Sequence, residues 1–387
     1  MQKWLAGRNG FGAVLMAGVC LLAMGVAGRA WAQATPEQRH LLSVVRIWDQ
    51  APHNAFTDLV EVDGTLYCVF REGTGHVPGA AGTNGSIRVL ASSDGQNWRS
   101  VALLIEPGMD LRDPKISRMP DGRLLLLIGG AIYEGERLIR NRTCVSFGTI
   151  SAGGVVFSAL VPVEIDAAIP DAQNSLWLWR VTWHDGLGYG VAYRTRHPPN
   201  RPNRPNREDE GPPSRSEPDV FLVSTRNGID YKLVTTMAIP DRPNETTLRF
   251  LPDGEMVAWV RRERGNQAGW IGFSRAPYRE WSWKEQSARL GGPDLIVLPD
   301  GQLIGVTRGH LPDRRTQTYV ARLSRDGAIE PLVTLPSGGD TSYAGLVRRH
   351  NRLLVSYYSS HEGRSAIYLA TIQLKEPSAP SAGAASP

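Results

Sequence analysis

Arginine recurs at a fixed distance from Asp-Gly pairs along the chain. Arg71, Arg261 and Arg308 each stand seven residues after the glycine of such a pair. A guanidinium group can hold a carboxylate through two parallel hydrogen bonds, so arginines gathered from distant segments are typical of a site for an acidic ligand. The alternative is that each arginine pairs with a neighbouring acid such as Glu72 or Asp113. The fold decides between them, because it sets which side chains meet.

The Asp-Gly pairs themselves indicate a repeated hairpin. Each pair lies between two runs of alternating or apolar residues, where a short turn would join antiparallel strands. The pairs begin at Asp63, Asp121, Asp185, Asp253 and Asp300, and His350-Asn351 takes the sixth place. Their spacing suits four strands with loops, and long amphipathic helices are absent. The sequence therefore predicts an all-β fold, a six-bladed β-propeller.

Two further features fit a propeller. The segment Leu41–Trp48 has the pattern of a strand, and we expect it to complete the last blade beside Leu353–Tyr358 and Ala366–Leu374, which closes the ring. The segment Ser92–Trp98 fits the Asp-box pattern Ser-x-Asp-Gly-x-x-Trp, a tight turn between the outer strands of a blade. Weaker relatives of this turn begin at Ser224 and Ser324.

In a propeller blade the innermost strand begins at one face of the ring, and the second strand returns to that face. We call this face the mouth. The residues predicted at strand starts, and therefore at the mouth, are His53, Asn54, Arg112, Asp113, Asn174, Glu245, Asp340 and Tyr343. The residues predicted at strand ends on the same face are Arg71, Glu72, Arg194, Arg261, Arg308, His310, His361 and Glu362.

These segments resemble the sialidase-like glycosidases, also called the Asp-box or BNR-repeat family, which are six-bladed β-propellers. The resemblance covers residues 41–374 and is nearest to the secreted bacterial exo-alpha-sialidase-like branch. It is carried by His53–Asp58, Phe70–Gly73, Asp110–Lys115, Asn244–Phe250 and Asp340–Tyr343, together with the Asp box at Ser92.

The resemblance implies roles for several of these residues. Family sialidases hold the substrate carboxylate with three arginines, attack with a tyrosine assisted by a glutamate, and use an aspartate as acid and base. Tyr343 matches the nucleophile, and Glu245 and Arg261 match the glutamate and the second arginine. Arg315 roughly matches the third arginine.

The sequence departs from the family pattern at two places. The Arg-Ile-Pro that opens the family's first blade is missing, because the corresponding segment reads His53-Asn54-Ala55. The loop over residues 72–86, where the catalytic aspartate is expected, contains no aspartate, and its ionisable groups are Glu72 and His76. The candidates for the proton donor are therefore Glu72 or His76, with Asp113 as a third.

A tyrosine with a pKa near 10 is a poor nucleophile unless a base removes its proton, so Glu245 is expected beside Tyr343. The alternative for Tyr343 is a core aromatic whose hydroxyl is satisfied. The arginines expected to bind the acidic group are Arg71, Arg112, Arg261, Arg308 and Arg315, and His53 and Asn54 would line the floor. No Cys/His metal spacing and no phosphate-binding glycine loop occurs, so no metal or cofactor is expected.

The resemblance and the arginines together predict that the protein is a secreted glycoside hydrolase acting on a terminal acidic sugar of a carbohydrate or glycoconjugate. One alternative is a carbohydrate-binding propeller without turnover. Another is a hydrolase or lyase acting on a polysaccharide that contains uronic acid, with His and Tyr as base and acid. Nucleic acid is not an expected partner, since the net charge of +5 over 387 residues is small and three basic residues lie in the leader described next.

The chain ends and one internal segment are expected to lie outside the blades. Residues 1–32 have the basic start, apolar run and Ala30-Trp31-Ala32 triplet of a cleaved signal peptide, which implies secretion or a periplasmic location and no membrane segment after cleavage. The propeller would span 33–375, with a mobile insertion at 196–218 and a disordered tail at 376–387. Cys68 and Cys144 are equally compatible with a disulfide and with two buried thiols.

Overall fold

The computed structural model describes residues 40–79, 82–135, 137–169, 176–195 and 220–374. These residues form strands, turns and loops, and among them no helix is long and apolar enough to cross a membrane. The expected leader (1–32), insertion (196–218) and tail (376–387) lie outside the described residues, so those three expectations stay predictions.

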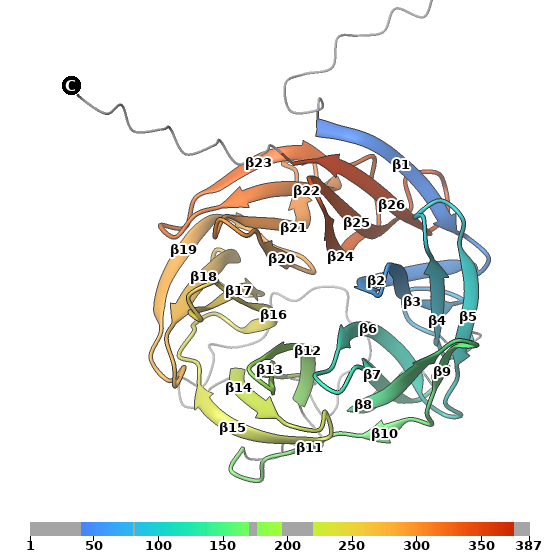
Figure 1. The fold of residues 1–387 in the computed structure, drawn as a ribbon, viewed down its shortest axis with the longest axis horizontal. Coiled ribbons are helices and arrows are strands. Elements are labelled where there is room, and N and C mark those ends of the chain that lie inside the picture. Colours follow the sequence, from blue (N-terminus) through green and yellow to red (C-terminus); the bar gives the residue numbers. More distant parts are fainter. Residues whose placement is uncertain (1–39, 80–81, 136, 170–175, 196–219, 375–387) are drawn as a thin grey trace, which may run out of the picture. The chain divides into compact units, whose positions relative to one another are not determined.

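The strands form six sheets arranged in a ring, which confirms the six-bladed β-propeller (Figure 1). Blade 1 contains β2 (His53–Val62), β3 (Thr65–Gly73), β4 (Ser86–Ser92) and β5 (Arg99–Leu104). Blade 2 contains β6 (Asp110–Arg118), β7 (Leu124–Glu134), β8 (Arg137–Ser151) and β10 (Val161–Pro162), and β9 (Gly154–Phe157) also pairs with β8. Blade 3 contains β12 (Leu176–His184), β13 (Leu187–Arg194), β14 (Val220–Thr225) and β15 (Asp230–Thr236), with β11 (Glu164–Ile165) parallel to β15.

The remaining blades complete the ring. Blade 4 contains β16 (Pro243–Phe250), β17 (Met256–Arg262), β18 (Ala268–Ser274) and β19 (Ser282–Arg289). Blade 5 contains β20 (Asp294–Val297), β21 (Leu303–His310), β22 (Thr316–Leu323) and β23 (Ile329–Thr334). Blade 6 contains β24 (Thr341–Arg349), β25 (Arg352–Ser359), β26 (Ala366–Gln373) and β1 (Leu41–Trp48).

Strand β1 closes the ring, as the sequence predicts. It pairs antiparallel with β26, with Val44 opposite Ala370, and supplies the outer strand of blade 6 (Figure 1). Blade 6 is thus built from both ends of the described chain. This pairing joins the first described strand to the last blade and so holds the ring closed.

Turn chemistry explains why the blades have this register. Asp63 and Gly64 have φ values of +49° and +79°, the consecutive left-handed pair that suits a two-residue hairpin turn. Between β4 and β5, the Asp94 carboxylate accepts the backbone N–H groups of Gln96 and Asn97, both at 2.8 Å. These bonds hold the pKa of Asp94 well below its ordinary value and fix the turn.

The core lies between neighbouring blades, in layers of apolar side chains. Strand β7 contributes Leu124, Leu126 and Ile128 to the layer between blades 1 and 2, and Leu125 and Leu127 to the layer between blades 2 and 3. Continuous apolar runs like this one are expected where a strand is covered on both faces. Cys68 and Cys144 are buried free thiols, which resolves the alternatives left by the sequence.

Candidate active site at the propeller mouth

Five of the six inner strands are interrupted near their start by a register shift. The residues inside these bulges include Phe56, Asp113, Trp179, Glu245 and Tyr343. Phe56, Asp113 and Tyr343 have φ values of +62°, +49° and +49°, a conformation that costs energy for a residue with a Cβ atom. A bulge re-aims a side chain out of the normal strand alternation, so these residues converge at the centre of the ring.

Tyr343 and Glu245, which the sequence pairs, are in direct contact. The Tyr343 hydroxyl donates a 2.7 Å hydrogen bond to Glu245 Oε1, and both residues are buried. Arg261 Nη1 lies 2.7 Å from the same carboxylate oxygen and donates to the tyrosine hydroxyl at 3.2 Å. Gly292 N donates to Glu245 Oε2 at 3.0 Å, and a Cβ atom at Gly292 would stand 2.7 Å from the Tyr343 ring. The position of the ring therefore requires glycine there.

Burial and charge set the protonation state of this pair. Burial opposes the charged form of Glu245, but the Arg261 guanidinium and the hydrogen bond from Tyr343 hold the pKa of Glu245 below its ordinary value. Burial and the charge on Glu245 raise the pKa of Tyr343. The pair therefore rests as a neutral phenol hydrogen-bonded to a carboxylate, a base placed to take the phenol's proton.

Aromatic rings surround Tyr343. The ring centre of Phe56 lies 5.2 Å from that of Tyr343, and the ring centre of Trp179 lies 5.8 Å away. Lys115 Nζ stands 4.5 Å from the centre of the Trp179 ring. These contacts fix the tyrosine ring, so its hydroxyl has little freedom to leave Glu245.

Two of the predicted binding arginines, Arg261 and Arg308, lie beside Tyr343 and differ in whether a carboxylate compensates their charge. Arg261 contacts the carboxylates of both Glu245 and Glu263, so its charge is compensated within the protein. Arg308 donates to the backbone oxygen of Thr341 at 2.8 Å and to the Tyr358 hydroxyl at 3.3 Å. Arg308 is thus held mainly by neutral acceptors, and its positive charge remains available to an anionic ligand.

Arg112 and Asp113 lie on the opposite side of the mouth, at the bulge of β6. Arg112 Nε is 3.5 Å from Asp113 Oδ2, and the Arg112 guanidinium carbon is 5.3 Å from the centre of the Phe56 ring. Burial raises the pKa of Asp113 although Arg112 opposes the shift. A carboxyl group whose pKa is raised in this way is suited to carry a proton to a ligand.

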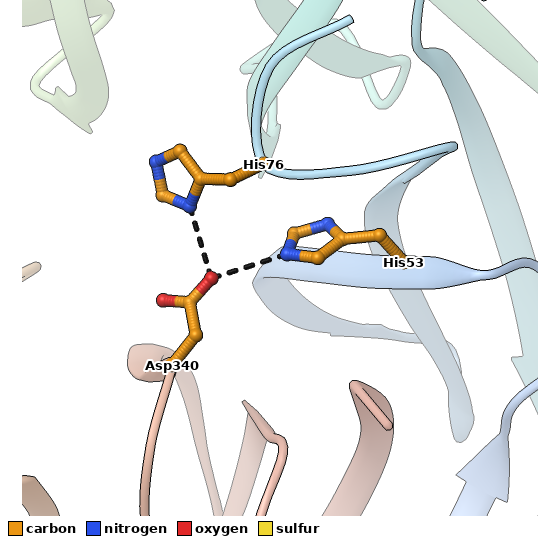
Figure 2. A group of neighbouring side chains, drawn as sticks. All are labelled: His53, His76 and Asp340. Atoms are coloured by element: carbon orange, nitrogen blue, oxygen red, sulfur yellow. Dashed lines mark hydrogen bonds and ion pairs between the residues drawn. The ribbon is translucent and has the colours of Figure 1, made fainter. Parts of the chain in front are cut away.

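Two histidines meet one carboxylate between blades 1 and 6 (Figure 2). His53 Nε2 lies 3.1 Å and His76 Nδ1 2.9 Å from the same atom, Asp340 Oδ2. The Tyr358 hydroxyl donates to the other oxygen, Asp340 Oδ1, at 2.7 Å. Burial opposes the charge on Asp340, but these partners hold its pKa well below the ordinary value.

Arg71 and Glu72 are adjacent on β3, and both side chains make their contacts inside the fold. The Arg71 side chain is 0% exposed and donates to Asp110 Oδ1 at 2.7 Å and to the backbone oxygen of Gly75 at 2.7 Å. Glu72 accepts from Trp48 Nε1 at 2.6 Å and pairs with Arg88 at 2.8 Å. Neither side chain is brought to Tyr343, because each already has close, buried partners.

Asn54 and Arg315 also stand apart from the cluster at the mouth. Asn54 is fully buried and donates to the backbone oxygens of Ala51 and Ser365, at 2.8 and 2.9 Å. The Arg315 side chain is 76% exposed on the turn between β21 and β22, where it pairs with Asp313 at 2.6 Å. The third arginine implied by the resemblance is therefore not brought to the cluster by the structure, and Arg308 lies beside Tyr343 instead.

The sequence reasoning missed a charged network within the inner strands. Arg180 Nη1 lies 2.8 Å from both Asp58 carboxylate oxygens, and Arg180 Nη2 lies 3.3 Å from Asp294 Oδ2. Asp294 also accepts from Arg249 Nη2 at 2.7 Å. All of these side chains except that of Arg249 are buried. A mixed charge pattern inside predicted inner strands was the signal that could have revealed this network.

Tyr193 is a second missed residue. It lies at the end of β13, and burial together with the charge on Glu245 raises its pKa well above the ordinary value. Its ring packs in the same cluster as those of Phe56, Trp179 and Tyr343. It precedes Arg194 at the end of β13, where the recurrence of arginine at strand ends gives no signal for a neighbouring tyrosine.

Comparison with solved structures gives the fold a wider context. A protein of unknown function from Dyadobacter fermentans is 18% identical, with 87% of this chain and 99% of that chain covered and a TM-score of 0.67. The alpha-L-arabinofuranosidase Arb93A from Fusarium graminearum is 14% identical, over 86% of this chain and 98% of the other, with a TM-score of 0.59. The chain has the sialidase-like propeller fold.

A sialidase from Trypanosoma rangeli, solved with sialic acid, is 10% identical with a TM-score of 0.55. The match covers 86% of this chain and 57% of the sialidase chain. No family model matches the chain, and no curated protein matches it. At these identities the likeness establishes the fold alone.

Proposed function

We propose that the protein is a retaining glycoside hydrolase that acts on a terminal acidic sugar, with Tyr343 as nucleophile. The observation that carries the proposal is the 2.7 Å hydrogen bond from the Tyr343 hydroxyl to Glu245, at the mouth of the propeller. A core tyrosine needs one acceptor, but here the acceptor is a buried carboxylate that is itself held by Arg261. That arrangement suits an activated nucleophile.

In the first half of the reaction, Tyr343 Oη attacks the anomeric carbon as the glycosidic C–O bond breaks. The phenolic proton passes to Glu245, and Asp113 gives its proton to the departing oxygen. Asp113 is preferred to Glu72 as donor because Glu72 is bonded to Trp48 and Arg88. The raised pKa of Asp113 favours its protonated form relative to an ordinary aspartate, which suits a proton donor.

In the second half, Asp113 takes a proton from water, and the water oxygen attacks the anomeric carbon of the tyrosyl-linked sugar. The bond to Tyr343 Oη breaks, and Glu245 returns its proton to the phenolate. Two displacements at one carbon retain the anomeric configuration.

The acidic character of the substrate is supported by Arg308. Its guanidinium is held by the Thr341 carbonyl and the Tyr358 hydroxyl, and its nearest acidic oxygen, Asp340 Oδ1, is 3.9 Å away. A neutral nucleophile also avoids repulsion with a substrate carboxylate. The neighbours of the fold include a sialidase solved with sialic acid and an arabinofuranosidase, so sugar-processing chemistry is known on this scaffold. We also propose export of the protein, on the basis of the leader at residues 1–32.

The test is product analysis on a panel of sialosides and uronic-acid glycans with Tyr343→Phe and Glu245→Gln. We expect wild-type turnover with retention, and both variants should lose several powers of ten in rate, at about 1.4 kcal/mol per power of ten. Tyr357→Phe is the matched control, because its buried hydroxyl bonds the Pro336 carbonyl in the same blade outside the cluster. That control should keep its activity.

Other outcomes identify the alternatives. Full activity of Tyr343→Phe, or an inverted product, would contradict the tyrosine nucleophile. An unsaturated product from a uronate glycan would identify a lyase. Binding of an acidic glycan that is equal in wild type and Tyr343→Phe, without turnover of any substrate, would identify a carbohydrate-binding propeller.

A further inference from the structure

We propose that His53, His76 and Asp340 bind one divalent transition-metal ion, with zinc preferred, at the mouth between blades 1 and 6. Two imidazoles and one carboxylate form a ligand set that suits Zn²⁺ in sites that keep a position open for water or substrate. This inference does not rest on the proposed hydrolase activity. Metal binding can be measured directly on the protein.

The geometry requires little change to accept an ion. His53 Nε2 and His76 Nδ1 lie 3.1 and 2.9 Å from Asp340 Oδ2, and the three atoms are all within 4.8 Å of one another. Ligand atoms about 2.0–2.1 Å from a tetrahedral zinc stand about 3.3 Å apart. Each histidine nitrogen would therefore move a few tenths of an ångström away from Asp340 Oδ2, and the two nitrogens, which lie within 4.8 Å of each other, would settle at a similar spacing. Figure 2 shows both ring nitrogens turned toward the same carboxylate oxygen.

Asp340 is oriented by a partner on its other carboxylate oxygen and by a bond from its backbone, as metal-binding carboxylates commonly are. The Tyr358 hydroxyl donates to Oδ1 at 2.7 Å, and the Asp340 backbone N–H donates to Ser360 Oγ at 2.9 Å. Arg308 stands 3.9 Å from Oδ1, on the side away from the histidine contacts. Oδ2 is thus the oxygen presented to an ion.

The loop that carries His76 is held by two arginines, Arg71, which is buried, and Arg112, which is partly buried. Arg71 Nη1 donates to the backbone oxygen of Gly75, next to His76, at 2.7 Å, and Arg112 Nη2 donates to the His76 backbone oxygen at 3.5 Å. These contacts hold the imidazole over blade 6 although half of its surface is exposed. Residues fixed in advance lose less freedom on binding, which favours affinity.

An ion at this place would remain open to solvent. The His76 side chain is 52% exposed and that of Asp340 is 30% exposed. The three protein ligands leave at least one coordination position for water or for an oxygen of a ligand. Phe56 contacts both the His76 ring and the Tyr343 ring, at 5.1 and 5.2 Å between centres, so the proposed metal site adjoins the aromatic cluster around Tyr343.

The test uses the purified protein without a polyhistidine tag, stripped with a chelator and dialysed. Titration with Co²⁺ is followed by visible absorption, and titration with Zn²⁺ by calorimetry. We expect one equivalent of each ion per chain, with zinc displacing cobalt. His76→Ala and Asp340→Asn should each weaken affinity by at least about tenfold.

His361→Ala is the matched control, because His361 lies at the mouth on blade 6 and its Nδ1 contacts Ser359 Oγ rather than Asp340. Its affinity should equal that of wild type. His76 is half exposed on a loop, so its variant should fold, and circular dichroism checks this. Absence of binding to wild type, or an equal affinity of wild type and His76→Ala for both ions, would overturn the proposal.

Discussion

Replacement of Arg180 tests whether the buried charges below the mouth hold the blades together. Arg180 lies on β12 and bonds Asp58 on β2 and Asp294 on β20, so it joins blades 1, 3 and 5. In Arg180→Met the new side chain fills most of the volume, so the change removes the charge with little cavity. What it leaves is two buried carboxylates.

The size of the loss follows from the partners that remain. Asp294 keeps Arg249 Nη2 at 2.7 Å and the Leu295 N–H at 2.8 Å, so its charge stays compensated. Asp58 keeps the Ile116 N–H at 2.8 Å as its remaining close donor and carries most of the cost. Lys115 also interacts electrostatically with Asp58 but forms no close ion pair with it, and removal of one partner of a buried ion pair costs about 3–5 kcal/mol. We expect the free energy of unfolding to fall by about this amount.

Urea unfolding at pH 7 measures this change, followed by both tryptophan fluorescence and far-ultraviolet circular dichroism. Coincident transitions license a two-state free energy. Arg180→Met combined with Asp58→Asn should be more stable than Arg180→Met alone, because the unpaired charge is gone. A loss below about 1 kcal/mol, or a double variant at least as unstable as the sum of the two single losses, would refute the reasoning.

Two further effects are expected from the structure. Partial burial and the charge on Arg289 lower the pKa of His310 to about 4, below the value of about 6.5 expected in the unfolded chain, although the residue is still exposed to solvent; a small part of the stability should therefore be lost as the pH falls from 6.5 to 4. His310→Gln should flatten that slope in urea unfolding at several pH values, and an unchanged slope would contradict the assignment. A Cβ atom at Gly345 would stand 2.1 Å from the backbone nitrogen of Leu59, so Gly345→Ala should cost about 1–3 kcal/mol or more. The control Gly153→Ala has its nearest atom at 3.7 Å and should change stability little, and equal melting temperatures for the two variants would contradict the packing argument.

The fold could be predicted from local signals because its turns are local. Asp63-Gly64 and its repeats require left-handed backbone, and few residues other than glycine, asparagine and aspartate supply it. The strand-like pattern of Leu41–Trp48 predicts that it completes the last blade, and β1 does pair with β26 there. Both features can be predicted without knowledge of which side chains are in contact.

The site could be predicted only in part, because bulges depend on packing between blades. The propeller pattern places Tyr343 and Glu245 at strand starts, the resemblance implies their roles, and both stand at register shifts. Trp179 and Arg180 occupy the equivalent bulge in blade 3, but strand alternation alone gives no reason to aim them at the centre. Arg71 is buried against Asp110 on the next blade, a pairing that sequence spacing does not reveal.

The arginines at the mouth therefore have two roles, and the burial of the side chain distinguishes one role from the other. Arg71 is inaccessible and uses its donors on Asp110 and the backbone of Gly75, so it positions the loop before His76. Arg308 is partly exposed, bonds mainly neutral oxygens and stands 5.5 Å from the Tyr343 ring centre, so its charge faces the place where a ligand would react. Their position at strand ends in the sequence does not distinguish Arg71 from Arg308. The decisive quantity is whether a carboxylate of the protein already compensates the guanidinium, and on that ground Arg308 is the residue whose replacement should affect anion binding most directly.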